Sequence, residues 1–227
     1  MYARFYSLGE VNYKNGDKFA GNFKDGRPCG KGDMIYKFSI PSAHGIEAPD
    51  ESTYSGEWKA GKREGRGVMK WQNDGSMYRG LWKNDMRENG EMRMANGNIY
   101  IGGFKNDKFH GMGRLLIANT GLIFEGLFNL GVCSPVGKLL YINGDMYYGQ
   151  HKSFSREGEG KLVSFDSSIY EGKWEQDRRN GKGRFVSANT GDVYIGEYIE
   201  SKRSGRGRQL YQATGEIYDG EWSNDKR

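Results

Sequence analysis

The chain has 227 residues, of which 36 are glycine and only four are proline, and 14% of the chain is aromatic. The aromatic content excludes a purely disordered chain, and the scarcity of proline excludes a collagen-like chain or a proline-rich linker. The net charge of +5 is mild and indicates an ordinary solvated surface more than a nucleic-acid-binding one.

Cysteines and targeting signals are sparse. Cys29 and Cys133 lie far apart, and no Asn-x-Ser/Thr glycosylation acceptor occurs, which is typical of a reducing intracellular compartment. No apolar run approaches the roughly 18 residues of a membrane span, and the first residues lack the apolar segment of a signal peptide. The sequence therefore predicts a cytoplasmic protein.

The elements predicted in chain order are copies of one short motif. Residues 8–19, "LGEVNYKNGDKF", look like the second half of a copy, and residues 54–67, "YSGEWKAGKREGRG", are a complete one. Copies after the second begin 22 to 24 residues apart, which is the period of a tandem repeat. The nine copies begin at Phe19, Tyr54, Tyr78, Tyr100, Phe124, Tyr147, Tyr170, Tyr194 and Tyr218.

The repeat determines where glycine occurs. When the first aromatic residue of each copy is numbered zero, positions −3, +2, +7, +11 and +13 hold 32 of the 36 glycines. This pattern resembles the MORN repeat, YxGxWxxGxxxGxG, over nearly the whole chain. The resemblance implies a row of β-hairpins that forms a long, twisted, single-layer antiparallel sheet with an aromatic groove.

The residues support that architecture independently of the resemblance. Side chains at 0, +2 and +4 project from one face of a strand, because side chains alternate along it. The polar segment from +5 to +10 predicts a hairpin connection, with Gly or Asp at +7 suited to a positive φ. Folding about this connection places +4 opposite +11, +2 opposite +13, and 0 opposite +15.

The predicted fold is all-β: an elongated single-layer antiparallel sheet of tandem β-hairpins. Residues 1–227 form a single array of about nine repeats, of which the first and last are incomplete. We expect about 17 strands, and a sheet roughly 80 Å long at about 4.8 Å per strand.

Tyrosine and tryptophan rings are predicted to lie over the bare glycine backbone and form a thin core. Trp58, Trp82, Trp174 and Trp222 should therefore be largely buried. The groove that the rings line is one candidate partner-binding surface. Its predicted residues are Tyr54, Trp58, Tyr78, Trp82, Tyr100, Phe104, Tyr170, Trp174, Tyr194 and Tyr198.

Several places depart from the repeat. Residues 33–53 contain an insertion, which is either a tolerated loop or a partner-contacting or capping element. Asn89 and Glu91 stand where glycines belong. These two positions, Pro135, His151 and Phe154 are expected to change the local twist, and the last three could also shape a specific contact. The chain ends at Arg227 inside a predicted hairpin, so we expect further chain or a partner at that edge.

No pattern in the sequence predicts catalysis, a bound cofactor or a metal site. The three histidines, His44, His110 and His151, belong to no HExxH motif, and Cys133 has no evident base. His110 is expected to be a solvated loop residue, and His151 to pack as an aromatic side chain. The sequence therefore predicts a protein that is not an enzyme.

Cations recur near the hairpin connections and predict a basic edge. They either keep the edge soluble or dock an acidic surface, which would be anionic lipid or an acidic protein. Nucleic acid is excluded as a partner because no aromatic residues interleave with these cations. The basic-edge residues are Lys62, Arg63, Arg66, Arg178, Arg179, Lys182, Lys202, Arg203 and Arg206.

Positions −1 and +16 are mostly apolar, although they point away from the face that carries the rings. They predict an apolar stripe on the back of the sheet, where a partner chain or a second copy would dock. The stripe residues are Ile99, Leu116, Ile123, Leu140, Val163, Ile169, Val186 and Val193.

The favoured interpretation is a non-enzymatic scaffold in a cytoskeletal, ciliary or flagellar assembly, where the family resemblance implies such arrays occur, for example in radial-spoke heads. Its partners would be cytoskeletal or ciliary subunits or a second copy. Two alternatives remain: a recruitment module for acidic phospholipids in membranes, and the accessory repeat domain of a larger enzyme.

Overall fold

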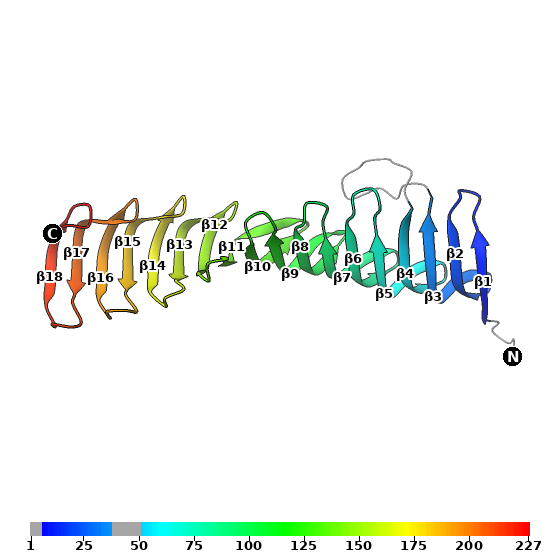
Figure 1. Ribbon diagram of the computed structural model, residues 1–227, viewed down its shortest axis with the longest axis horizontal. Coiled ribbons are helices and arrows are strands. Elements are labelled where there is room, and N and C mark those ends of the chain that lie inside the picture. The colour runs from blue at the N-terminus through cyan, green and yellow to red at the C-terminus, as the bar shows by residue number, and fades with distance from the viewer. Residues whose placement is uncertain (1–5, 38–50) are drawn as a thin grey trace. The chain divides into compact units, whose positions relative to one another are not determined.

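The computed structural model describes residues 6–37 and 51–227, and these residues form 18 β-strands and no helix (Figure 1). The prediction of an all-β fold built from tandem antiparallel hairpins is confirmed. The strands are β1 (Tyr6–Asn12), β2 (Lys18–Lys24), β3 (Arg27–Tyr36), β4 (Ser52–Lys59), β5 (Lys62–Lys70), β6 (Met77–Lys83), β7 (Met86–Arg93), β8 (Ile99–Lys105), β9 (Lys108–Ile117), β10 (Leu122–Asn129), β11 (Val132–Leu140), β12 (Met146–Lys152), β13 (Ser155–Val163), β14 (Ile169–Glu175), β15 (Arg178–Val186), β16 (Val193–Ile199), β17 (Lys202–Leu210) and β18 (Ile217–Trp222).

Contacts divide the chain into two units. Unit 1 holds the described residues up to Asn119 together with Phe128–Val132, and unit 2 holds Thr120–Leu127 together with Cys133–Arg227. Strands β1 to β9 pair antiparallel in chain order, and so do strands β11 to β18. Because a strand pairs only with its chain neighbours, each hairpin depends on the next one for burial.

Two-residue turns close every hairpin at what we call the turn edge. Positions +6 and +7 both have a positive φ, between 45° and 95°, in all nine copies. Positive φ at both central residues is the signature of the type I′ turn, whose twist matches that of paired strands. The predicted connection from +5 to +10 is therefore too long, since Lys59 at +5 already pairs with Lys62 at +8.

Glycines at +2 and +13 face each other, as predicted. In unit 2 they form one unbroken row across the strands, from Gly137 to Gly220. An equivalent row in unit 1 runs from Gly9 to Gly113. The aromatic residue at zero faces +15, also as predicted; Tyr54, for example, lies opposite Met69.

The prediction that +4 faces +11 is wrong. Trp58 faces Arg63 at +9, because a β-bulge between Gly56 and Trp58 shifts the register. Gly65 at +11 has a φ of 65° and lies opposite Trp82 of the next copy. Glycine is therefore needed at +11 because the bulge gives this residue a left-handed backbone conformation. It is not needed to make room for a ring of its own hairpin.

The hairpin of the copy that begins at Tyr78 is one residue shorter than the hairpins of the neighbouring copies. Gly90 faces Gly80 there, so Asn89 and Glu91 do not replace glycines as predicted. In the predicted insertion, residues 33–36 belong to β3 and residues 52–53 belong to β4. Residues 38–50, which include His44, lie outside the described residues.

Candidate functional site

Aromatic side chains at 0 and +4 form the core of each unit. Tyr54 and Tyr78 are 0% exposed, and Trp58 and Trp82 are 5% and 3% exposed. The Tyr54 ring meets Trp58 of its own copy at 5.1 Å and Trp82 of the next copy at 5.4 Å, both edge to face. Such pairs add about 0.5–1.5 kcal/mol beyond their area burial. The same alternation links rings from Phe19 to Phe128 in unit 1 and from Tyr147 to Tyr218 in unit 2.

The burial of the four tryptophans is confirmed, and partner binding in the groove that the rings line stays a prediction. Each of the ten predicted groove residues is at most 8% exposed, because the neighbouring rings cover it. Their burial assigns them to packing between hairpins. These residues are Tyr54, Trp58, Tyr78, Trp82, Tyr100, Phe104, Tyr170, Trp174, Tyr194 and Tyr198.

Each tyrosine at zero lies over the glycine pair of its own hairpin. A Cβ atom added at Gly160 would stand 2.1 Å from Tyr147 Oη and 2.3 Å from its ring carbons. The hydroxyl of Tyr147 donates to the carbonyl oxygen of Gln150 at 2.6 Å, beside the bulge between Gly149 and His151. Burial raises the pKa of this phenol. Glycine is thus required here because the ring occupies the space of a side chain.

An arginine at +9 ties four copies to the next one, an arrangement that we call the arginine staple. The backbone N–H and Nε of Arg63 donate to Asp85 Oδ1 at 2.8 and 3.3 Å, and Nη2 donates to the Asp85 carbonyl oxygen at 3.0 Å. The guanidinium lies over the Trp82 ring, 4.3 Å from its centroid. Equivalent staples join Arg87 to Asp107, Arg156 to Asp177, and Arg203 to Asp225.

The staple also lowers the pKa of the aspartate in its last copy, Asp225. Burial alone would raise the pKa of Asp225, but hydrogen bonds from the backbone and side chain of Arg203 more than offset it and hold that pKa below its ordinary value. The Asp225 carboxylate is therefore ionised at neutral pH and accepts from two N–H groups.

The predicted basic edge divides into two kinds of cation. Arg63, Arg179 and Arg203, at +9, were predicted as members of the basic edge, but they are half-buried against rings. Two exposed arginines of this edge pair with acids, Arg178 with Glu200 and Arg206 with Glu221. The exposed cations are Lys62, Arg66, Arg178, Lys182, Lys202 and Arg206.

Replacing Arg63 by lysine should lower the free energy of unfolding by about 1–2 kcal/mol, because a lysine cannot reproduce the forked contact or the stacking on Trp82. Urea unfolding followed by tryptophan fluorescence measures it. Arg66→Lys is the matched control, since Arg66 is exposed, and should change stability by less than about 0.5 kcal/mol. Equal effects of the two changes would show that the staple does not stabilise the array.

Apolar residues form a continuous row on the face opposite the rings, which we call the back face. In unit 2 this row contains no lysine or arginine. Its eight members lie on the eight strands β11 to β18, and each pairs with the member on the next strand. Most are half-buried, and Met146 and Ile217 are 36% and 51% exposed. We call Leu140, Met146, Val163, Ile169, Val186, Val193, Leu210 and Ile217 the back ladder.

The back face of unit 1 differs. Lys70 and Arg93 interrupt the row there, and Ile99 pairs with Leu116 as its apolar remnant. Of the predicted stripe residues, Ile123 lies in β10 and is half-buried. The apolar row is therefore unbroken in unit 2 and interrupted in unit 1, where the predicted stripe residues Ile99 and Leu116 still pair with each other.

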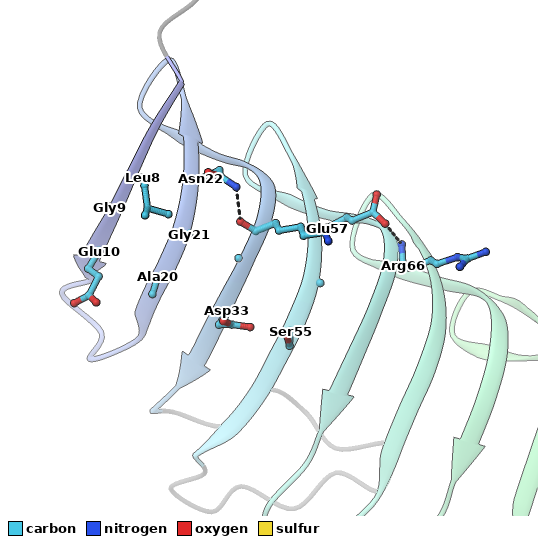
Figure 2. Close-up of a pocket in the computed structure, with 13 residues that line it drawn as sticks. Leu8, Gly9, Glu10, Ala20, Gly21, Asn22, Asp33, Ser55, Glu57 and Arg66 are labelled. Carbon is cyan, nitrogen blue, oxygen red and sulfur yellow. Dashed lines mark hydrogen bonds between the residues drawn. The ribbon is translucent and has the colours of Figure 1, made fainter.

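A trough of about 1080 Å³ crosses strands β1 to β5 on the back face of unit 1. Figure 2 shows Glu10, Ala20, Asp33 and Ser55 along one side and Asn22, Glu57 and Arg66 along the other, with glycines between them. Asn22 Nδ2 donates to the Lys31 carbonyl oxygen at 3.2 Å, and the Arg66 N–H donates to Glu57 Oε1 at 3.2 Å. The trough could not be predicted from the repeat pattern, because the residues at +1 and +3 that line it differ between copies.

His151 packs as an aromatic residue, as predicted. Its ring is 6% exposed, stacks on Phe154 at 5.6 Å and meets Phe124 edge to face at 5.0 Å. Neither ring nitrogen has a hydrogen-bond partner within the described part of the chain. Burial lowers the pKa of this imidazole.

This depressed pKa predicts that unit 2 loses stability in acid. The neutral imidazole is favoured in the folded state, so its contribution is complete above the unfolded pKa of about 6.5 and is lost as pH falls through the lower folded value. The fall in unfolding free energy from pH 7.5 to pH 5 should therefore be larger in the native chain than in His151→Trp. An equal fall in both proteins would show that His151 does not titrate on unfolding.

The other candidate chemical groups do not gather into a site. His110 lies half-buried in β9, so the prediction that it is a solvated loop residue is wrong. Cys29 and Cys133 are both free, and burial raises the pKa of the Cys133 thiol. Over residues 6–37 and 51–227, no group of three or more His, Cys, Asp or Glu could hold a metal ion. The same residues include no helix able to cross a membrane.

Comparisons with known proteins agree with the repeat geometry. A family model described as MORN repeat matches residues 19–37, 54–76, 78–99, 100–121, 170–191, 194–212 and 218–227. The copies that begin at Phe124 and Tyr147 fall outside these matches, although Tyr147 faces Leu162 in the same register as its counterparts.

Individual relatives match only in part. Alsin of Mus musculus and alsin of Homo sapiens are each 35% identical to this chain over 121 residues, which cover 48% of this chain and 7% of alsin. The TCP10 domain of Danio rerio CPAP has a TM-score of 0.51 at 9% identity, with 94% of each chain covered. That likeness is one of fold alone.

Proposed function

Because this chain belongs to the MORN repeat family, whose repeats are non-catalytic interaction modules, we propose that it is a scaffold that docks other proteins on the back face of unit 2 within a cytoskeletal or ciliary assembly. The scaffold would act in the cytoplasm and would bind without chemical conversion of its partner.

The back ladder is the observation that carries this proposal. Its eight residues are neighbours across strands β11 to β18, and the rings on the opposite face already form the core. A single-layer sheet has no need of a second apolar face. Covering this one would contribute about 25 cal/mol for each Å² of apolar surface removed from water.

Charges beside the ladder favour a protein as its occupant. The adjoining row of exposed residues holds charges of both signs and two apolar side chains. In order across the strands it reads Tyr148, Lys161, Glu171, Arg184, Ile195, Arg208 and Asp219. A polar rim of both signs around an apolar strip is typical of protein interfaces, whereas an anionic membrane attracts clusters of a single sign. The assignment to the cytoskeleton or a cilium is supported by the occurrence of MORN arrays in such assemblies.

The experiment compares two variants, each with two substitutions to aspartate on the same pair of strands. Leu140→Asp with Val163→Asp alters the ladder, and Lys138→Asp with Lys161→Asp alters the adjoining row on the same strands, β11 and β13. Each protein is used to capture partners from a lysate of ciliated cells, and each captured protein is purified and its binding is measured again.

The proposal expects cytoskeletal or ciliary proteins to bind the native chain and the lysine variant, and to be lost from the ladder variant, while all three give the same circular dichroism. Unchanged capture by the ladder variant contradicts it. Unfolding of the ladder variant also contradicts it, because the ladder would then be internal packing.

Exposed lysines favour a second candidate, recruitment to acidic phospholipids. Lys62, Lys182 and Lys202 are exposed on equivalent hairpins, and the structure pairs none of them with an acid among the described residues. Reversing all three charges should abolish sedimentation with phosphatidylserine vesicles at low salt. No sedimentation of the native protein would remove this candidate.

A further inference from the structure

The arginine staple is either complete or wholly absent between neighbouring copies, with one exception. Four junctions have both the arginine at +9 and the aspartate at +7 of the next copy. Three junctions have neither residue: Pro28 with Gly61, Phe109 with Gly131, and Cys133 with Phe154. Only Arg179 keeps the arginine while serine, Ser201, takes the place of the acid.

Arg179 keeps two of the three hydrogen bonds of a complete staple. Its backbone N–H donates to Ser201 Oγ at 3.1 Å, and Nη2 donates to the Ser201 carbonyl oxygen at 2.9 Å. Nε, which donates to a carboxylate in the four complete staples, has no acceptor among the described residues. The acid-binding side of this guanidinium is therefore built but unfilled.

Aromatic rings partly shield the Arg179 guanidinium from water. The guanidinium carbon lies 4.9 Å from the Tyr198 ring centroid and 5.5 Å from that of Tyr170, so rings replace part of its water. Arg179 and Ser201 line a cavity of about 550 Å³ on the ring face of unit 2. Asp145, Asp166 and Asp177 also line this cavity, and Asp177 is already paired with Arg156. A charge pair formed where water is partly excluded is stronger than one on an open surface.

We propose that Arg179 binds a carboxylate, the side chain of an aspartate or glutamate from a partner protein, in the position that the aspartate occupies in complete staples. In the complete staples one carboxylate oxygen accepts from Nε as well as from the backbone N–H. The backbone N–H of Arg179 already donates to Ser201 Oγ, so the bound carboxylate accepts from Nε. The site lies on the ring face at the turn edge, so it is independent of docking on the back ladder.

The test uses a hexaglutamate peptide labelled with a fluorophore and the full chain. Ser201→Asp fills the site from within, and Ser153→Asp adds the same charge to another two-residue turn of unit 2, where Cys133 replaces the arginine. The anisotropy of the peptide gives its affinity, and the Arg179 Nε–H resonance reports whether the peptide reaches this residue.

We expect saturable binding to the native chain with a shift of the Arg179 resonance. Ser201→Asp should weaken binding at least about tenfold, which is the equivalent of one charge-assisted hydrogen bond, and should raise the melting temperature. Ser153→Asp should do neither.

Three results would overturn the inference: no binding of hexaglutamate to the native chain, equal binding by Ser201→Asp, or a lower melting temperature in Ser201→Asp. Arg179-dependent binding of phosphatidylserine vesicles without peptide binding would also overturn it, because the anion would then be a lipid headgroup.

Discussion

Replacing Trp174 by alanine should lower the free energy of unfolding by about 3–5 kcal/mol, as for other large aromatic residues removed from a core. Trp174 is 5% exposed and meets Tyr147 and Tyr170 edge to face at 5.5 and 5.0 Å. Its Nε1 donates to the Gly160 carbonyl oxygen at 3.2 Å, and the Arg156 guanidinium lies 4.2 Å from its ring centroid. One substitution thus removes contacts within its own hairpin and with the preceding hairpin.

Urea unfolding measures this change, with Tyr148→Ala as the matched control. Tyr148 is an aromatic residue of the same unit but lies on the back face and is 63% exposed. Its replacement should cost less than about 1 kcal/mol, because little of its surface is buried on folding. A loss below about 1 kcal/mol for Trp174→Ala would mean that the ring lies on an open surface, where a ligand could reach it.

Gly160→Ala should lower the free energy of unfolding by about 1–3 kcal/mol, the usual effect of adding a methyl group to a filled core. The added Cβ would stand 2.1 Å from Tyr147 Oη and 2.3 Å from ring carbons, so the buried phenol would have to move off the glycine row. The same displacement would weaken the hydrogen bond from Tyr147 to the Gln150 carbonyl oxygen.

Gly9→Ala tests whether the ring, and not the strand, causes that loss. Gly9 belongs to the glycine row of unit 1, but its added Cβ would meet only Phe23, at an ordinary 3.5 Å. We expect a change within about 0.5 kcal/mol, and alanine can even stabilise such a position by restricting the unfolded chain. If Gly9→Ala lowers the free energy of unfolding as much as Gly160→Ala does, glycine is required in this row by the backbone geometry and not by the rings.

Much of the fold could be predicted because the same pattern of aromatic residues and glycines occurs in nine copies. The aromatic residue at zero and the glycine at +2 lie on the same face of a strand. Folding the hairpin about its polar connection correctly predicted that Gly56 lies opposite Gly67 and Tyr54 opposite Met69. The bulge was missed because a glycine required for a left-handed backbone and a glycine required for space look alike in a sequence. Only the φ of 65° at Gly65 separates them.

The arginine staple was missed although the sequence contains its signal. Arg63 and Asp85 are 22 residues apart, and arginine at +9 is followed by aspartate at +7 of the next copy at four junctions. Charges near hairpin turns were interpreted as one basic edge, because periodicity alone does not tell which cations face the rings. Pairing each cation with the acid of the next copy would have separated Arg63 from the exposed Arg66.

The most direct test of the ring-over-glycine core is a double-mutant cycle between Tyr147 and Gly160. Unfolding free energies are measured for the native chain, Gly160→Ala, Tyr147→Ala and the double variant. If the ring is what makes glycine necessary, Gly160→Ala should cost about 1–3 kcal/mol beside Tyr147 and less than about 0.5 kcal/mol once Tyr147 is alanine. The same cost in both backgrounds would contradict the account, because the glycine row would then be independent of the rings that cover it.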